Sequence, residues 1–313
     1  MTHRTKSNLL LLFIYIMSFT LGYWAGGFVP GEILLQSAVA VVIAVTVIFA
    51  GSFFFNNSSV FDPYWSLAPP IMMMFYFTGI LQIASLIPYP GSHIPDPSSR
   101  IPDLLFSSPR ILILFLLTLA YSIRLTWNFL RGWPGLNHED WRYVDFRKFT
   151  GRFYWVVSFF GIHLFPALMV FGGTLSIWVV VVHCSGTMNF LDILAILVTG
   201  YAIFLETAAD RQLRNFMLQN KESGKTLNQG LWGLSRHPNY LGEILFWWGL
   251  YLFALAANPD FWWVITGPVA ITLMFIFASI PMIEKRMMKR QKDYETYKEM
   301  VSMLVPWKIK INR

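Results

Sequence analysis

Charged residues are scarce in this sequence, and their scarcity excludes an ordinary soluble domain. Only 13% of the 313 residues are Asp, Glu, Lys or Arg, whereas 55% are hydrophobic. The mean hydropathy is +0.50. Soluble domains carry about 25% charged residues. The composition therefore predicts an integral membrane protein.

Groups that mark several common enzyme classes are also missing. Cys184 is the single cysteine, which excludes an intrachain disulfide and a cysteine metal cluster. We find no His-Glu-x-x-His and no His–carboxylate cluster with transition-metal spacing, so we predict no metal site. The sequence also lacks a Walker A lysine motif, a Gly-x-Gly-x-x-Gly after a strand, and a Gly-x-Ser-x-Gly. These absences argue against soluble nucleotide-binding folds and serine hydrolases.

Long apolar runs take the place of these motifs. Runs of about 20 mostly apolar residues, enough to cross a hydrocarbon core of about 30 Å, recur along the whole chain. We therefore predict an all-α integral membrane protein with about eight transmembrane helices, or nine if the fifth is split around Pro166. The predicted spans are approximately 8–26, 32–55, 67–88, 109–130, 153–182, 190–213, 240–257 and 261–283.

The basic residues are distributed unevenly between the two sides of the predicted membrane domain. An even number of spans places both termini on one side, and only Arg100 and Arg110 then fall in loops on the other side. The other basic residues cluster at 4–6, 124–152, 211–236 and 285–313. This asymmetry predicts cytoplasmic termini, in the endoplasmic reticulum of a eukaryote or the inner membrane of a bacterium. Anionic lipid or a phosphorylated cofactor then accounts for the net charge of +7, and no nucleic-acid partner is needed.

Charges inside the predicted spans are the informative ones, because each costs a few kcal/mol there unless it is paired or hydrated. Glu206, Asp210 and Arg214 in the sixth span are spaced i, i+4, i+8, so they project from one helical face. The seventh span opens with Asn239 and Glu243, again at i, i+4. An intrahelical salt-bridge ladder would also explain the first set, and this alternative stays open from sequence.

The start of the seventh span, GLWGLSRHPNYLGE (230–243), predicts a site for a nucleotide cofactor. A helix N-terminus offers a positive dipole end and free N–H groups. Arg236 and His237 stand beside it, and together they suit a phosphate. Other polar groups at the same membrane level suit ribose hydroxyls and an amide: Glu206, Asp210, Asn239 and Glu243.

These stretches resemble a known family. GLWGLSRHPNYLGEILFWWG, ETAADRQLRNF and YETYKEMVSMLVPW are similar to the C-terminal signature of the steroid 5-alpha-reductase family, and most similar to its uncharacterised branch, domain of unknown function 1295. FDPYWS (61–66) and RLTWNFLRGWPGLNHEDWRY (124–143) extend the likeness to most of the chain from about 60 onward. The resemblance implies N-terminal transmembrane helices over 1–60 and a catalytic domain over 61–313, joined in one continuous membrane domain.

The resemblance implies an NADPH-dependent membrane reductase that transfers a hydride to a conjugated C=C of a sterol-like or other lipid enone. In the steroid reductases, positions similar to Glu206, Asp210 and Arg214 contact NADPH. The first of them is an asparagine there, so Glu206 is a departure. Asn239-Tyr240-Leu241-Gly242-Glu243 matches the family's Asn-aromatic-x-Gly-Glu, which implies further cofactor contacts by Asn239, Tyr240 and Glu243.

Arginines favour NADPH over NADH as the cofactor. Arg286 is the best match to the basic region that precedes the family's last aromatic pair. Arg214, Arg236 and Arg286 could each pair with the 2′-phosphate, because the guanidinium fork suits phosphate oxygens.

The catalytic residues match the family less closely. Steroid reductases polarise the enone carbonyl with a glutamate from an early span and a tyrosine from a later one. Tyr121 resembles that tyrosine, but the nearest early carboxyl is Asp62 of FDPYWS. We predict Tyr121 and Asp62 as the groups that stabilise charge on the carbonyl oxygen. The departure leaves the hydrophobic substrate open between sterol, polyprenyl, fatty enone and quinone-like molecules.

Two alternative functions remain open from the sequence. Membrane-embedded S-adenosylmethionine-dependent methyltransferases of prenyl or lipid substrates share the Arg-His-Pro-x-Tyr turn and the late aromatic pair. A sterol- or lipid-binding protein or a transporter would also carry acids within spans. The oligomeric state is not predicted.

Overall fold

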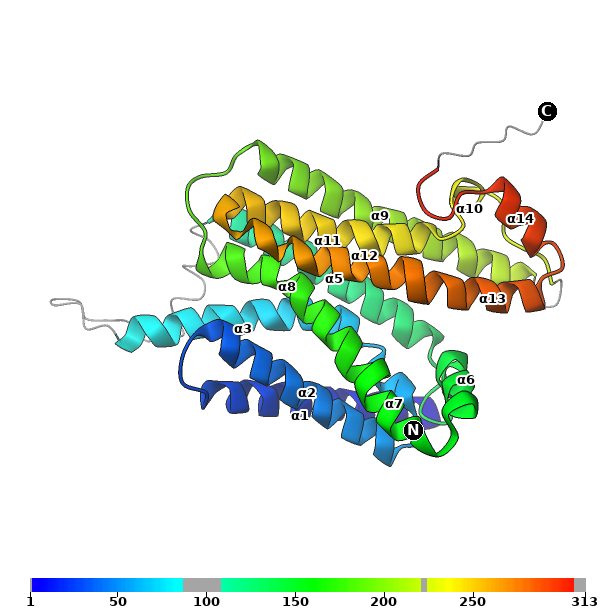
Figure 1. The fold of residues 1–313 in the computed structure, drawn as a ribbon, viewed down its shortest axis with the longest axis horizontal. Helices are drawn as coiled ribbons and strands as arrows, with labels where there is room; N and C mark the ends of the chain where they lie inside the picture. The colour runs from blue at the N-terminus through cyan, green and yellow to red at the C-terminus, as the bar shows by residue number, and fades with distance from the viewer. Residues whose placement is uncertain (1, 87–107, 221–223, 307–313) are drawn as a thin grey trace.

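All regular secondary structure in the described part of the chain is helical. The structure is a computed structural model and describes residues 2–86, 108–220 and 224–306, without the side chains of 81–86. The β-type pairing in these residues is limited to an isolated bridge between Ser235 and Ser302. The predicted all-α fold is confirmed (Figure 1).

Seven helical runs among the described residues are long and apolar enough to cross a membrane. They are His3–Gly27, Ile33–Phe54, Pro109–Gly132, Trp141–Val182, Phe190–Gln219, Pro238–Ala257 and Pro259–Arg290. Each coincides with a predicted span. The third predicted span, 67–88, coincides with α3, Tyr64–Leu86, and its last two positions lie outside the described residues. The chain is therefore a multi-pass membrane protein.

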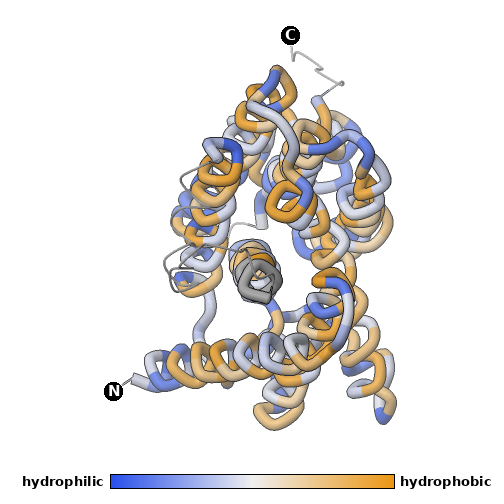
Figure 2. The backbone as a smooth tube through the Cα atoms, turned by 90° about the vertical axis from the view of Figure 1, so that its left-hand side faces the viewer, coloured by the Kyte–Doolittle hydropathy of each residue, from blue (hydrophilic) through white to orange (hydrophobic). Residues whose placement is uncertain are grey.

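The helices that position the site follow one another through the bundle. They are α1 (His3–Gly27), α2 (Ile33–Phe54), α3 (Tyr64–Leu86), α5 (Pro109–Gly132), α6 (Trp141–Thr150), α7 (Tyr154–Val157), α8 (Phe165–Val182), α9 (Phe190–Gln219), α10 (Leu231–Leu234), α11 (Pro238–Ala257), α12 (Thr266–Met274), α13 (Ile280–Arg290) and α14 (Tyr294–Met300). Hydrophobic residues run along most of their length (Figure 2).

Small residues bring α9 and α11 into the most extensive helix contact of the described bundle. Ala195, Thr199 and Ala202 on α9 are buried. A Cβ atom at Gly249 on α11 would overlap the Thr199 hydroxyl, and one at Gly242 would lie 2.9 Å from the Ala202 carbonyl oxygen. Small side chains let membrane helices approach closely where no hydrophobic force drives them together. The side chains next to this contact are therefore held in fixed positions.

One end of the bundle carries most of the charge, and we call it the basic end. The beginnings of α1 and α11, the ends of α5 and α9, and helices α6, α10 and α14 lie there, on the right in Figure 1. Of the described Lys and Arg residues, Arg110 alone lies at the opposite end. Both ends of the described chain are at the basic end (Figure 1). A cytoplasmic location for this end stays a prediction.

The fifth predicted span lies in one helical run, Trp141–Val182, so the predicted alternative of a split into two spans around Pro166 is not seen in the described residues. A π-helical segment, Ser158–Leu164, lies directly before the turn that contains Pro166. A second, Phe275–Ser279, lies directly before the turn that contains Pro281. Proline removes a backbone donor, so the hydrogen-bond ladder must change near it.

A buried ion pair fastens the end of the bundle opposite the basic end. Arg110 in the first turn of α5 donates to Asp192 of α9 through Nε at 2.6 Å and Nη2 at 2.8 Å. Arg110 Nη2 also donates to the Thr187 carbonyl at 2.9 Å. Asp192 accepts from the Asn189 backbone N–H at 2.7 Å and so completes the capping box of α9. The two side chains are 1% and 0% exposed.

Candidate functional site

A cavity of about 780 Å³ lies near the basic end, among α3, α5, α6, α8, α9, α11 and α13. This volume is within the range of small-molecule sites, which is about 300–1,000 Å³. One wall is polar, whereas the wall formed by the two π-helical segments and the turns beside them is mostly apolar. The cavity is lined by five of the predicted cofactor residues and one predicted catalytic residue: Glu206, Asp210, Asn239, Tyr240, Glu243 and Asp62.

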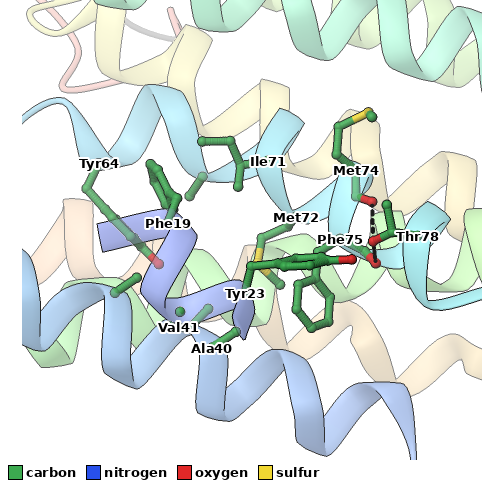
Figure 3. Close-up of a pocket in the computed structure, with 13 residues that line it drawn as sticks. Phe19, Tyr23, Ala40, Val41, Tyr64, Ile71, Met72, Met74, Phe75 and Thr78 are labelled. Carbon is green, nitrogen blue, oxygen red and sulfur yellow. Dashed lines mark hydrogen bonds between the residues drawn. The ribbon is translucent and has the colours of Figure 1, made fainter. Parts of the chain in front are cut away.

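A second pocket has a different character. It lies between α1, α2 and α3, has a volume of about 140 Å³, and is lined mainly by aromatic and aliphatic side chains (Figure 3). The hydroxyl of Thr78 donates to the Met74 and Phe75 carbonyls, as the dashed lines show. The pocket is below the usual size of a ligand site. We therefore place the candidate site in the larger cavity.

Asp210 is the centre of the polar wall. Arg124 Nη1 of α5 lies 3.1 Å from Asp210 Oδ2, and Asn128 Nδ2 lies 3.0 Å from the same oxygen. Asn239 Nδ2 of α11 lies 3.3 Å from Asp210 Oδ1. Arg124 Nη2 forms a further ion pair with Glu206. The intrahelical ladder considered from sequence is therefore wrong, because Glu206 and Asp210 both pair with an arginine of another span.

Glu243 is held by two donors from behind the cavity wall. Tyr121 donates its hydroxyl to Glu243 Oε1 at 2.6 Å, and Trp247 Nε1 donates to the same oxygen at 2.9 Å. The Tyr121 ring is fully buried and stacks on Phe246 with centroids 3.7 Å apart. Tyr121 is not among the residues that line the cavity. The structure therefore places the predicted catalytic tyrosine where it orients Glu243.

Asp62 lies on the cavity wall where the 3-10 turn Ser58–Phe61 meets α3. Tyr143 donates its hydroxyl to Asp62, and Arg142 lies 3.6 Å from it. Burial raises the pKa of Asp62 to about 6, although Arg142 and the Tyr143 hydrogen bond act in the opposite direction. Asp62 is thus a carboxyl that exchanges its proton near neutral pH.

The raised pKa of Asp62 predicts a pH-dependent stability. The folded state binds a proton more tightly than the unfolded chain, so its stabilisation is complete below about pH 4 and is lost as the pH rises through about 6. We expect wild-type protein in nanodiscs to lose on the order of 1–3 kcal/mol across this window relative to Asp62→Asn, measured by thermal unfolding. Parallel pH profiles for the two proteins would contradict the assignment.

Arg236 and His237 are predicted from the sequence to bind a phosphate. In the structure both pair with an acid from another span. Arg236 Nε lies 2.8 Å and His237 Nε2 3.1 Å from Glu284 Oε1. Lys298 Nζ lies 3.1 Å from the other carboxyl oxygen of Glu284. Burial lowers the pKa of His237, and Glu284 acts against it. Neither Arg236 nor His237 lines the cavity, so the structure does not bring them to the other predicted cofactor residues, and their contact with a phosphate stays a prediction.

His237 still reaches the cavity indirectly. Its ring stacks on Tyr240, with centroids 5.5 Å apart and the rings 10° from parallel. Tyr240 lines the cavity. We call Glu284 with its partners Arg236, His237 and Lys298 the Glu284 cluster. This cluster therefore fixes the position of the first turn of α11 and of the Tyr240 ring.

One cation of the cavity lining, Arg142, was missed from sequence. Arg142 lines the cavity, with Nε 2.7 Å from Asp140 Oδ1, and its side chain is 38% exposed. Arg286 lies over the Trp141 ring at 4.1 Å, and Trp141 also lines the cavity. Arg214 is half-buried, does not line the cavity, and forms no ion pair with the described residues. The sequence feature that could have identified Arg142 is its position between two aromatic residues, Trp141 and Tyr143.

Comparison with known proteins places the chain in a family. The model of the family described as "Protein of unknown function (DUF1295)" matches residues 105–302. The chain belongs to this family. The predicted branch is thereby confirmed. The matched region of the family contains Tyr121, Arg124, Asp210 and Glu243, and hence most of the polar wall.

A curated relative covers nearly the whole chain. An uncharacterised protein of Schizosaccharomyces pombe is 27% identical over 96% of this chain and 86% of its own length. No solved structure matches the chain. The likeness to the steroid reductases therefore rests on the motifs described above.

Proposed function

We propose that this protein is a membrane reductase that uses NADPH to reduce a conjugated C=C of a lipid. The observation that carries the proposal is the convergence of Asp210, Asn239 and Glu243 on one cavity with an apolar opposite wall. Polar groups inside membrane spans are costly and mark functional sites. Such a site does not need the Walker A or Gly-x-Gly-x-x-Gly motif by which soluble proteins bind nucleotides.

The polar wall fits the sugar and amide portions of the cofactor. Carboxylate and amide oxygens accept hydrogen bonds from ribose hydroxyls and a carboxamide. Glu206, Asp210, Asn239 and Glu243 would hold these groups, and Tyr240 supplies an aromatic face beside them. NADPH, when bound, would supply a hydride.

The phosphates would lie beside Trp141 on the cavity wall. Arg142 and Arg286 both border Trp141 there, and guanidinium groups suit phosphate oxygens. This arrangement replaces Arg236 and His237 as phosphate ligands. The basic end, which we infer to be cytoplasmic, would then face the side from which the cofactor enters.

The apolar wall fits a lipid substrate. Trp65, Phe165 and Phe275 line it, together with Ile162 and Met282. Sterol, polyprenyl, fatty enone and quinone-like molecules share the required chemistry, an activated C=C on a hydrophobic body. Asp62 lies on the wall of the same cavity, where its protonated form would donate to the carbonyl oxygen.

Ligand titration tests the proposal. We expect NADPH to bind the protein in nanodiscs saturably, detected by energy transfer from tryptophan and by thermal stabilisation. Asp210→Asn should raise the Kd for NADPH roughly 10–100-fold, because charge-assisted hydrogen bonds of about 1.5–3 kcal/mol are lost. The matched control Asp260→Asn changes an exposed residue at the other end and should leave the Kd unchanged.

The other outcomes decide against the reductase. Binding of S-adenosylmethionine alone would favour a membrane methyltransferase of a prenyl or lipid substrate. Binding of neither ligand would assign the polar wall to structure or transport. An Asp210→Asn variant that binds NADPH as tightly as the wild type would place the cofactor elsewhere.

A further inference from the structure

Two carboxyl groups of the polar wall meet across the contact between α9 and α11. Glu206 and Glu243 are 3% and 7% exposed, and both line the cavity. Glu243 directly follows Gly242 on α11, and the side chain of Glu206 packs on Gly242. Gly242 permits the meeting, because a Cβ atom there would overlap Glu206 Cγ.

Two neighbouring carboxyl groups can bond to each other only if one of them keeps its proton. Ionised carboxyl oxygens only accept hydrogen bonds, so an O–H on one member would join the pair. Two carboxyls that share a site release their protons in separate steps, because like charges at contact repel. The close packing of Glu206 beside Glu243 therefore favours a pair that retains one proton.

The charges that face the pair lead to the same conclusion. Arg124 from α5 is the one described cation beside it, and Asp210 from α9 adds a third acid. Tyr121 and Trp247 contribute neutral donors, both to Glu243 Oε1, and Asn239 faces Asp210. One guanidinium cannot neutralise three carboxylates, and each uncompensated charge within a membrane span costs a few kcal/mol. A retained proton removes one such charge.

The pair also borders the cavity that would hold a ligand. Glu206 Oε2 is buried and accepts no hydrogen bond from the described residues, although Arg124 Nη2 is paired with it as an ion. Both glutamates belong to the cavity wall. An acceptor and an exchangeable proton are thus presented together to whatever occupies the cavity.

We propose that Glu206 and Glu243 share one proton at neutral pH and present it to the cavity as the acid of the site. The role as a proton donor in catalysis rests on the proposed function. In that reduction the hydride adds to one carbon of the C=C while the π bond breaks. The pair's proton forms the C–H bond at the other carbon and leaves two carboxylates, which Arg124, Tyr121 and Trp247 stabilise. Water returns the proton.

Infrared spectroscopy of the full chain in nanodiscs tests the shared proton without any ligand. We expect the C=O band of a protonated carboxylic acid at neutral pH, shifted to lower frequency in D₂O because the proton exchanges through the cavity. Glu206→Gln and Glu243→Gln should each abolish this band. Glu139→Gln should leave it unchanged, because Glu139 is paired with Arg147 outside the cavity. Tyr121→Phe should move the band without removing it, since a donor to Glu243 is lost.

Three results would overturn the proposal: no such band in the wild type, a band that survives both glutamine substitutions, or a band unaffected by D₂O. The result is independent of the cofactor. A wild-type band together with absent NADPH binding would refute the reductase and retain the proton pair. NADPH binding without the band would support the reductase and refute the proton pair.

Discussion

Arg110→Met is expected to lower the free energy of unfolding by about 3–5 kcal/mol, because it leaves the Asp192 carboxylate buried without its cation. Asp192 is 0% exposed and bonded to Arg110 by two hydrogen bonds, so water cannot replace the lost partner. Chemical unfolding in mixed micelles, followed by helical circular dichroism, measures the loss. Arg131→Met is the matched control: it lies at the exposed end of the same helix, and we expect a change within about 0.5 kcal/mol.

A double substitution separates the unpaired charge from the missing contact. Arg110→Met combined with Asp192→Leu removes both charges, and hydrophobic replacements of buried pairs are often close to neutral. We expect the double variant to be more stable than either single variant. It will not recover completely, since Asp192 also caps α9. A double variant as unstable as the sum of the single losses would show that the two residues act independently.

Gly242→Ala is expected to damage the site and the fold together. The added methyl would overlap Glu206 Cγ and lie 2.9 Å from the Ala202 carbonyl oxygen, so α9 and α11 must separate or Glu206 must move. Overpacking of this kind costs about 1–3 kcal/mol. The displaced Glu206 should also raise the Kd for NADPH at least tenfold, measured in the same titration as above.

Gly200→Ala provides the control for the added methyl group. Gly200 lies in α9 next to Thr199, but a Cβ atom there meets nothing within 4 Å. We expect unchanged or slightly higher stability and unchanged cofactor affinity, because alanine favours helix more than glycine does. If the two alanine variants behaved alike, close packing of α9 on α11 would not be what positions Glu206.

The polar wall could be predicted because its members obey local rules. Glu206 and Asp210 are four residues apart on one helix, as are Asn239 and Glu243 on the next. The sixth predicted span ends and the seventh begins at the same membrane surface. The two polar helix faces therefore lie at the same depth in the membrane. The positions of the spans followed equally from hydropathy and length.

The pairing of charges between distant segments could not be predicted in the same way. Arg236 and Glu284 are 48 positions apart, and several neighbouring cations offered Glu284 equivalent partners in sequence. Arg124 was placed in a basic cluster, although it lies inside the predicted fourth span. The criterion that singled out Glu206, a charge within an apolar run, would have identified Arg124 too. Helix contacts in three dimensions decide which of these charges meet.

The Glu284 cluster has a consequence for the order in which the protein is made. Arg236 donates to the backbone carbonyls of Lys298 and Val301, and the Ser235–Ser302 bridge joins the same two segments. During synthesis, the start of α11 therefore reaches the membrane well before its partners exist. Until residues 284–302 leave the ribosome, a buried arginine and histidine have no acid to pair with. The cavity wall that α11 supplies can thus be completed only after residues 284–302 have been synthesised, and a ribosome stalled before this point would hold an immature site.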